Sequence, residues 1–159
     1  MWTNFFSAAA SASAALAGLV FVAISVNIQR VLAYPHLVAR AGATIGALIL
    51  ILIASMAALA PQSERVLGVE IAGGGALGWL LAFWSARHVL RARRVSAELQ
   101  PRLALTIVMG QLQVLPFIAG GVLMAAGLSY GIRWVAGGVM TTFIVSVFNA
   151  WVLLVEILR

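Results

Sequence analysis

The 159-residue chain contains no cysteine, lysine or aspartate. Without cysteine it has no disulfides, thiolate metal ligands or thiol nucleophiles. Only 9% of its residues are charged, whereas an ordinary soluble domain has about a quarter. With 64% hydrophobic residues, such a chain has too few polar groups to cover the surface of a water-soluble fold. Lipid removes this difficulty because apolar side chains face acyl chains, so the composition predicts an integral membrane protein.

All ten basic residues are arginine, and the net charge is +6. Together with the abundance of alanine and valine, this indicates a GC-rich genome and hence a protein of the bacterial inner membrane. The arginines cluster at the ends of apolar runs, where they contact anionic phospholipid headgroups and set topology. We therefore expect lipid rather than nucleic acid as the partner of this charge. The candidate headgroup-facing residues are Arg91, Arg93, Arg94 and Arg102.

Five apolar runs have the roughly 20 residues that a membrane-spanning helix needs. They cover approximately residues 5–28, 37–60, 66–90, 103–127 and 132–158. The connections are short, so the prediction is an all-α fold, a polytopic transmembrane helical bundle that forms a single domain over residues 1–159. Residues 1–4 carry no basic side chain, so no cleaved signal peptide is expected.

The distribution of arginine predicts the orientation of these spans. Two arginines, Arg65 and Arg133, lie on one predicted side of the membrane. The other side has eight, namely Arg30, Arg40, Arg87, Arg91, Arg93, Arg94, Arg102 and Arg159. Because the arginine-rich side is normally cytoplasmic, we expect the N-terminus outside and the C-terminus in the cytoplasm.

The first predicted helix is rich in small residues. Ser7, Ser11, Gly18 and Ser25 follow one another at spacings of four and seven, so they share one helix face. Such a face lets another helix approach closely and predicts helix–helix packing. The alternative is a stripe of hydroxyl groups that lines a pore.

Glu70 lies about one turn inside the third predicted helix, with Gly74 and Gly78 on the same face. A carboxylate at that depth is costly unless it is hydrated, paired or protonated. One interpretation is an interfacial side chain that reaches water or pairs with Arg65 or Arg133. The other is a proton or cation site, which the glycine run at 73–75 opens to water or to a neighbouring helix.

Polar side chains also lie deep in the last two predicted helices. Gln111 and Gln113 lie near the middle of the fourth, in which Pro116 is expected to cause a kink and to leave the carbonyl of Leu112 without its donor. A polar stripe on the fifth helix consists of Thr142, Ser146, Asn149 and Glu156, and Asn27 lies near the inner end of the first helix. Hydrogen bonds between helices explain such stripes at about 0.6–2 kcal/mol per contact. The alternative is a hydrated path between subunits.

The sequence has no set of residues typical of catalysis or of a cofactor site. His36 and His88 both lie near the predicted cytoplasmic edge, but no third ligand follows at a useful spacing. No Ser-His-Asp set, carboxylate pair or phosphate-binding loop is present. We therefore expect no metal, no cofactor and no enzymatic activity.

Several blocks of the chain resemble a family of small bacterial polytopic membrane proteins, some of which are labelled modulators of the FtsH protease. The blocks are AALAGLVFVAIS at 14–25, Asn27, residues 29–30, 34–35, 40–42, 61–63 and 67–70, and WVLLVEILR at 151–159. The resemblance implies a small inner-membrane protein that regulates a membrane-bound AAA protease. It brings no motif of catalytic or binding residues.

Two functions remain open. The first is a self-associating structural or regulatory membrane protein, which the small-residue faces and the absence of catalytic sets favour. The second is a homo-oligomeric ion channel or transport protein, which the polar stripes and Glu70 favour. Both predict a homo-oligomer, because five short helices bury little surface among themselves.

Overall fold

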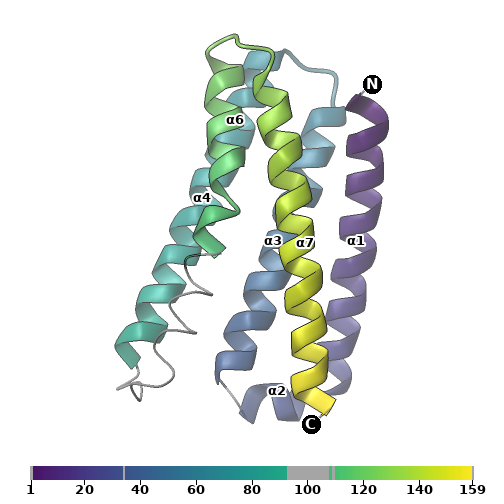
Figure 1. The fold of residues 1–159 in the computed structure, drawn as a ribbon, viewed down its shortest axis with the longest axis vertical. Helices are drawn as coiled ribbons and strands as arrows, with labels where there is room; N and C mark the ends of the chain where they lie inside the picture. The colour runs from purple at the N-terminus through teal and green to yellow at the C-terminus, as the bar shows by residue number, and fades with distance from the viewer. Residues whose placement is uncertain (1, 34, 93–107, 109, 159) are drawn as a thin grey trace.

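The computed structural model describes residues 2–33, 35–92, 108 and 110–158. In this part of the chain the regular elements are all helices, which confirms the predicted all-α class. They form an elongated antiparallel bundle (Figure 1). Helices α1 (Trp2–Val26), α4 (Glu64–Ala92) and α7 (Gly131–Leu158) run in one direction, and α3 (Pro35–Leu59) and α6 (Leu115–Ala125) run in the other. The short α2 (Ile28–Ala33) lies at the same end of the bundle as the C-terminus.

Four helices in the described residues are long and apolar enough to cross a membrane. These segments are Trp2–Val26, Ala41–Leu59, Glu64–Trp84 and Gly131–Val152. The fourth of the five predicted spans, 103–127, is described only at residue 108 and from residue 110 onward. There it forms a shorter apolar segment, Gly110–Ala125, whose helix is interrupted at Gln113 and Val114. Helix α1 begins at one end of the bundle, and helix α7 ends at the other (Figure 1).

Local sequence explains where two of the helices begin and end. Ser63 precedes α4, and its Oγ accepts a hydrogen bond from the backbone N–H of Val66 at 3.4 Å, as a helix N-cap does. At the end of α6, Gly127 has a φ of +84°, which glycine adopts without steric cost. The N–H of Leu128 then donates to the carbonyl of Leu123 at 2.9 Å, which completes a Schellman motif and reverses the chain toward α7.

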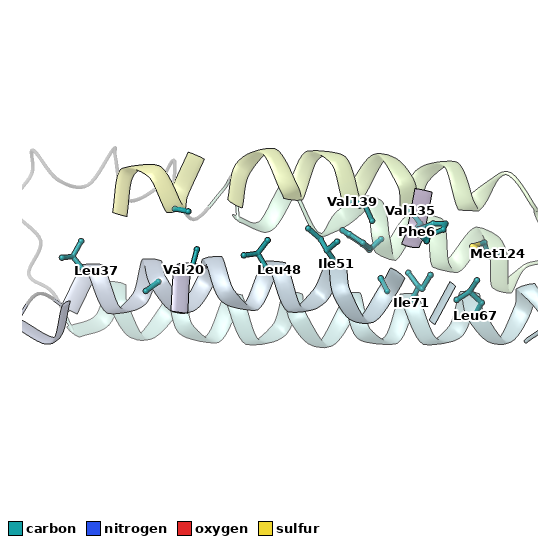
Figure 2. Close-up of a cluster of buried hydrophobic side chains, with 14 of the residues drawn as sticks. Phe6, Val20, Leu37, Leu48, Ile51, Leu67, Ile71, Met124, Val135 and Val139 are labelled. Carbon is teal, nitrogen blue, oxygen red and sulfur yellow. The ribbon is translucent and has the colours of Figure 1, made fainter. Parts of the chain in front are cut away.

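The hydrophobic core extends along the length of the bundle (Figure 2). Its most buried side chains come from four helices and include Phe6, Leu48, Ile51, Phe117 and Val135. Helix α1 packs mainly on α3, and α4 packs mainly on α6. Helix α7 contacts α6, α3 and α1, and so connects these two pairs.

Glycine at two adjacent positions lets α6 approach both of its neighbours. A Cβ on Gly121 would stand 2.5 Å from the backbone nitrogen of Ala72 and 2.7 Å from the carbonyl oxygen of Gly68, both on α4. A Cβ on Gly120 would stand 2.7 Å from the carbonyl oxygen of Gly131 on α7. Real Cβ atoms essentially never make such contacts. Helix α6 is therefore held between α4 and α7 by direct backbone packing, as is common between membrane helices.

Candidate functional site

Glu70 lies near the end of the bundle that carries the α3–α4 and α6–α7 connections. It is six residues into α4, which corresponds to about 9 Å along the axis, and its side chain is exposed. Gln62 donates from Nε2 to Glu70 Oε2 at 2.9 Å, and the same nitrogen is 2.9 Å from the carbonyl oxygen of Ala57. The partner of Glu70 in the described residues is thus Gln62 rather than Arg65 or Arg133, and burial does not isolate the carboxylate.

The same end of the bundle is tied together by other polar contacts of α4. Ser129 in the α6–α7 connection donates from Oγ to Glu64 Oε2 at 2.9 Å. The guanidinium of Arg65 lies beside Gly127, 3.6 Å from the position that a Cβ there would occupy. These contacts make the end of the bundle a polar cap in which Glu70 is one of several exposed groups.

The glycines at 73–75 divide between two environments. Gly73 and Gly74 are exposed, and nothing lies within 4 Å of a Cβ built on either. Gly75 faces α6, where its Cβ would stand 3.0 Å from Cγ1 of Ile118. A Cβ built on Gly78 would stand 4.0 Å from Cδ2 of Leu50 on α3. Among the residues that the structure describes, no helix therefore packs closely on the face that Glu70 shares with Gly74, whereas the opposite face of α4 packs on α6.

The predicted kink of the fourth span is a two-residue break between two helical segments, at which Val114 keeps right-handed helical φ and ψ values. Residues 110–112 are helical, Gln113 and Val114 form a turn, and α6 begins at Leu115 with Pro116 in its first turn. Thr142 on α7 is fully buried and donates from Oγ1 to the carbonyl oxygen of Gln113 at 3.2 Å. Gln113 of the fourth predicted helix and Thr142 of the polar stripe on α7 therefore meet at this break.

Several polar atoms near the break are buried without a hydrogen-bond partner. In residues 110–158 they are Oε1 of Gln111, Oε1 of Gln113 and Oγ of Ser146. Ser146 is only 1% exposed and lies one turn beyond Thr142 on the same face of α7. A fourth such atom in the described residues is Oγ of Ser55. It belongs to α3, four residues before that helix ends, and is not part of α6 or α7.

Two other residues of the predicted seam have different positions. Asn149 is half-buried on α7, three residues after Ser146. Asn27 lies at the turn between α1 and α2, and its Nδ2 donates to the carbonyl oxygen of Ala23 at 3.0 Å. Asn27 thus caps its own helix and does not join Gln111, Gln113 and Ser146. The side chain of Glu156 lies outside the described part of the chain.

The small-residue face of α1 points away from the bundle. Ser7, Ser11, Gly18 and Ser25 are all exposed, and nothing lies within 4 Å of a Cβ built on Gly18. The hydroxyl of Ser11 donates to the carbonyl of Ser7 at 3.0 Å, and that of Ser25 donates to a carbonyl in its own helix at 2.9 Å. These hydroxyls are satisfied locally, so the face is smooth and nearly apolar. Helix α1 packs on α3 through its other side, which includes the buried Ser13.

The predicted headgroup-facing arginines fall largely outside the described residues. Arg93, Arg94 and Arg102 lie there entirely, as do the side chains of Arg91, His36 and His88. Among the residues that the structure describes, no three His, Cys, Asp or Glu side chains come together to hold a metal ion.

Sequence reasoning missed the paired role of Gly120 and Gly121 and the buried hydroxyls of Thr44 and Ser55 on α3. The adjacent glycines in a short apolar segment were the available signal for close packing on two sides. Single hydroxyls in a long apolar run, such as those of α3, carry no comparable signal because they do not form a stripe.

No family model, curated protein or solved structure matches this chain.

Proposed function

We propose that this chain is a non-enzymatic, self-associating protein of the bacterial inner membrane that serves as a structural or regulatory partner. The observation that carries the proposal is the outward face of α1. Its first half exposes only small side chains between the aromatic end and Gly18, namely Ser7, Ala8, Ser11, Ala12, Ala14 and Ala15. Large apolar side chains are exposed on either side of this stretch, as at Trp2 before it and at Leu19 and Phe21 after it.

Lipid-facing positions do not require small residues, because acyl chains accommodate leucine and phenylalanine well. Small residues give an advantage where a second helix approaches, because they bring backbones close and increase van der Waals contact. The same chain uses this chemistry internally, where Gly68 and Ala72 of α4 meet Gly121 of α6. On α1 the occupant that we propose is α1 of a second copy, since the face is uncharged and the hydroxyls of Ser11 and Ser25 are already bonded within the helix.

For the topology we propose five spans with the N-terminus outside and the C-terminus in the cytoplasm. Support comes from the start of α1 and the end of α7, which lie at opposite ends of the bundle (Figure 1). Arg65 and Arg133, the two arginines of the arginine-poor side, both belong to the end of the bundle at which α4 and α7 begin. A reporter fused after Arg159 that is active only in the periplasm would contradict this orientation.

Regulation of a membrane protease is the finer proposal, and it rests on the family resemblance alone. It predicts that the affinity-tagged protein, extracted in mild detergent, carries a membrane-bound AAA protease with it. A Ser11→Leu variant serves as a control that tells whether self-association is needed for that contact. Absence of the protease from both preparations would remove this proposal while leaving self-association untouched.

Cysteine cross-linking tests self-association directly, because the natural chain has no cysteine. Ser11→Cys places a thiol on the small-residue face of α1. Met140→Cys places one on α7, at a position that is 58% exposed. Both residues lie nine positions after the first residue of their helix. Under mild oxidation in native membranes we expect a disulfide-linked dimer from Ser11→Cys and little from Met140→Cys. Equal yields at the two positions would indicate random collisions and refute the assignment of the face.

An oligomeric channel has a specific observation in its favour, namely the buried polar atoms of Gln111, Gln113 and Ser146. Ser146, however, is 1% exposed, and Thr142 one turn before it is 0% exposed, so both lie between helices of one bundle. Copies of the chain cannot bring such residues to a shared axis without opening the bundle. Ion flux into proteoliposomes that Glu70→Ala or Gln113→Leu abolishes would favour the channel over the assembly role.

A further inference from the structure

A break in an apolar helix and two unpartnered oxygen atoms, on Gln113 and Ser146, occur near one another in the middle of this bundle. We propose that ordered water binds at this break, held by Gln113 on one side and by Ser146 on the other. The proposal does not depend on self-association through α1. It assigns a ligand, neutral water, to a site within a single copy of the chain.

The break lies near mid-depth. Helix α6 has 11 residues, so its first residue is about 16 Å from its end. The neighbouring α7 has 28 residues and is therefore about 42 Å long. A break there opens hydrogen-bonding groups of the backbone where no bulk solvent is available, and helix breaks at this depth occur where they line a polar cavity.

Helix register brings the unpartnered atoms to the same place. The hydrogen bond from Thr142 to the carbonyl of Gln113 fixes α7 against the break at 3.2 Å. The two segments are antiparallel, so the residue four positions beyond Thr142 lies beside the residues that precede Gln113. Ser146 is at that position, so its unpartnered Oγ lies within about one helical turn of Gln113, whose Oε1 is also unpartnered. Gln111 is two residues before Gln113 and therefore lies on another side of its helical segment.

The chemistry of the groups selects water. The Oε1 of Gln113 only accepts hydrogen bonds, whereas the hydroxyl of Ser146 both donates and accepts them. An anion would add further acceptors and would meet no positively charged side chain among these residues. A cation would meet no carboxylate among these residues and would face the positive end of α6. Water donates two hydrogen bonds, and buried water typically makes about three bonds to groups that otherwise lack partners.

Stability measurements distinguish a hydrated site from a dry one. If the site is dry, removing an unpartnered hydroxyl stabilises the fold; if water binds it, the same change removes a bond. Ser13→Ala is the matched control, because Ser13 is also fully buried at comparable depth but its hydroxyl bonds to the carbonyl of Ala10 at 3.0 Å. We expect Ser146→Ala, like Ser13→Ala, to shift the unfolding equilibrium about three- to tenfold toward the unfolded state relative to the wild-type protein in detergent–SDS micelles.

Gln113→Leu provides a second variant of similar size, and it should likewise destabilise the protein. Either variant being more stable than the wild-type protein would overturn the proposal. The wild-type stability should also be equal in sodium, potassium and choline chloride at matched ionic strength. A stabilisation that is specific to one alkali cation and is lost in Gln113→Leu would overturn the assignment to water.

A direct measurement is water-edited solid-state NMR of the ¹⁵N-glutamine-labelled protein in bilayers, with Gln113→Leu used to assign its side-chain signal. We expect polarisation from water to reach the Gln113 amide about as fast as that of Gln62, which lies in the polar cap. The backbone amide of Leu48, buried in the core, provides the dry reference in a leucine-labelled sample. A Gln113 signal that builds up as slowly as that of Leu48 would refute the site.

Discussion

The contact between α4 and α6 leads to a sharp prediction for a single added methyl group. Gly68 and Gly74 are both interior residues of α4, but only Gly68 faces α6. A Cβ on Gly68 would stand 2.7 Å from the carbonyl oxygen of Gly121 and 2.8 Å from the carbonyl carbon of Met124, and it would also collide with the backbone nitrogen of Ala125. A Cβ on Gly74 meets nothing within 4 Å.

The magnitude follows from two opposing effects. Alanine is favoured over glycine inside a helix by about 1 kcal/mol, so Gly74→Ala should raise the free energy of unfolding by up to that amount. For Gly68→Ala the helices must separate by about 0.7 Å before the Gly121 contact reaches an ordinary 3.4 Å. A gap of about 0.5–1 Å forfeits a quarter to a half of the dispersion energy of the atoms involved, and overpacking typically costs about 1–3 kcal/mol. The two variants should thus differ by about 2 kcal/mol or more, roughly thirtyfold in the unfolding equilibrium.

The assay is unfolding by SDS in mixed micelles, followed by the fluorescence of the five tryptophans and by circular dichroism. Both variants add the same methyl group to the same helix, so propensity and detergent binding cancel in the comparison. If Gly68→Ala were as stable as Gly74→Ala, the close approach of α4 and α6 would be wrong.

Three further changes test other contacts. Thr142→Val should lower the free energy of unfolding by about 1–3 kcal/mol, because it leaves the Gln113 carbonyl at the break unbonded. Thr141→Val loses only bonds to its own helix and should have little effect in the same SDS titration. Gly127→Ala should lower the free energy of unfolding by about 1–2 kcal/mol, because the φ of Gly127 is +84°. Gly127→Asn should lower it less, because asparagine adopts this conformation more readily. Thermal melts in which the alanine variant is more stable than the asparagine variant would contradict the left-handed turn. Gln62→Leu should change the unfolding free energy by about 1 kcal/mol at most, since its bond to Glu70 is exposed, and a larger loss would mean that the polar cap contributes more to stability than its geometry indicates.

Helical periodicity predicted faces well but did not predict what each face contacts. Ser7, Ser11, Gly18 and Ser25 do share one face of α1, yet only the structure places that face on the outside. The glycines at 73–75 were expected to admit a neighbour beside Glu70, and the neighbour lies instead against Gly75. Pairing between helices depends on contacts between distant residues, such as Gly68 with Gly121, for which a single sequence has no periodic signal.

The position of the helix break shows a similar limit. Pro116 predicted a disturbance of the fourth span, and the lost donor to Leu112 was the expected reason. The helix in fact stops at Gln113 and restarts so that Pro116 falls in the first turn of α6, where its missing N–H is not needed. The buried partner of the interrupted backbone, Thr142, comes from the next helix and was predicted only as part of a stripe.

The two adjacent glycines of α6 also limit how the bundle can move. Rotation of α6 about its axis would replace Gly120 or Gly121 at one contact by a residue with a side chain, and a shift along the axis by one residue would do the same. Helices α4, α6 and α7 are therefore expected to move as one rigid body. Among the described helices, a change of shape is therefore expected where α4 meets α3, since a Cβ on Gly78 would reach only Leu50, at 4.0 Å, or at the turn of Gln113 and Val114. Packing thus directs the movement of these helices to one internal boundary and one turn.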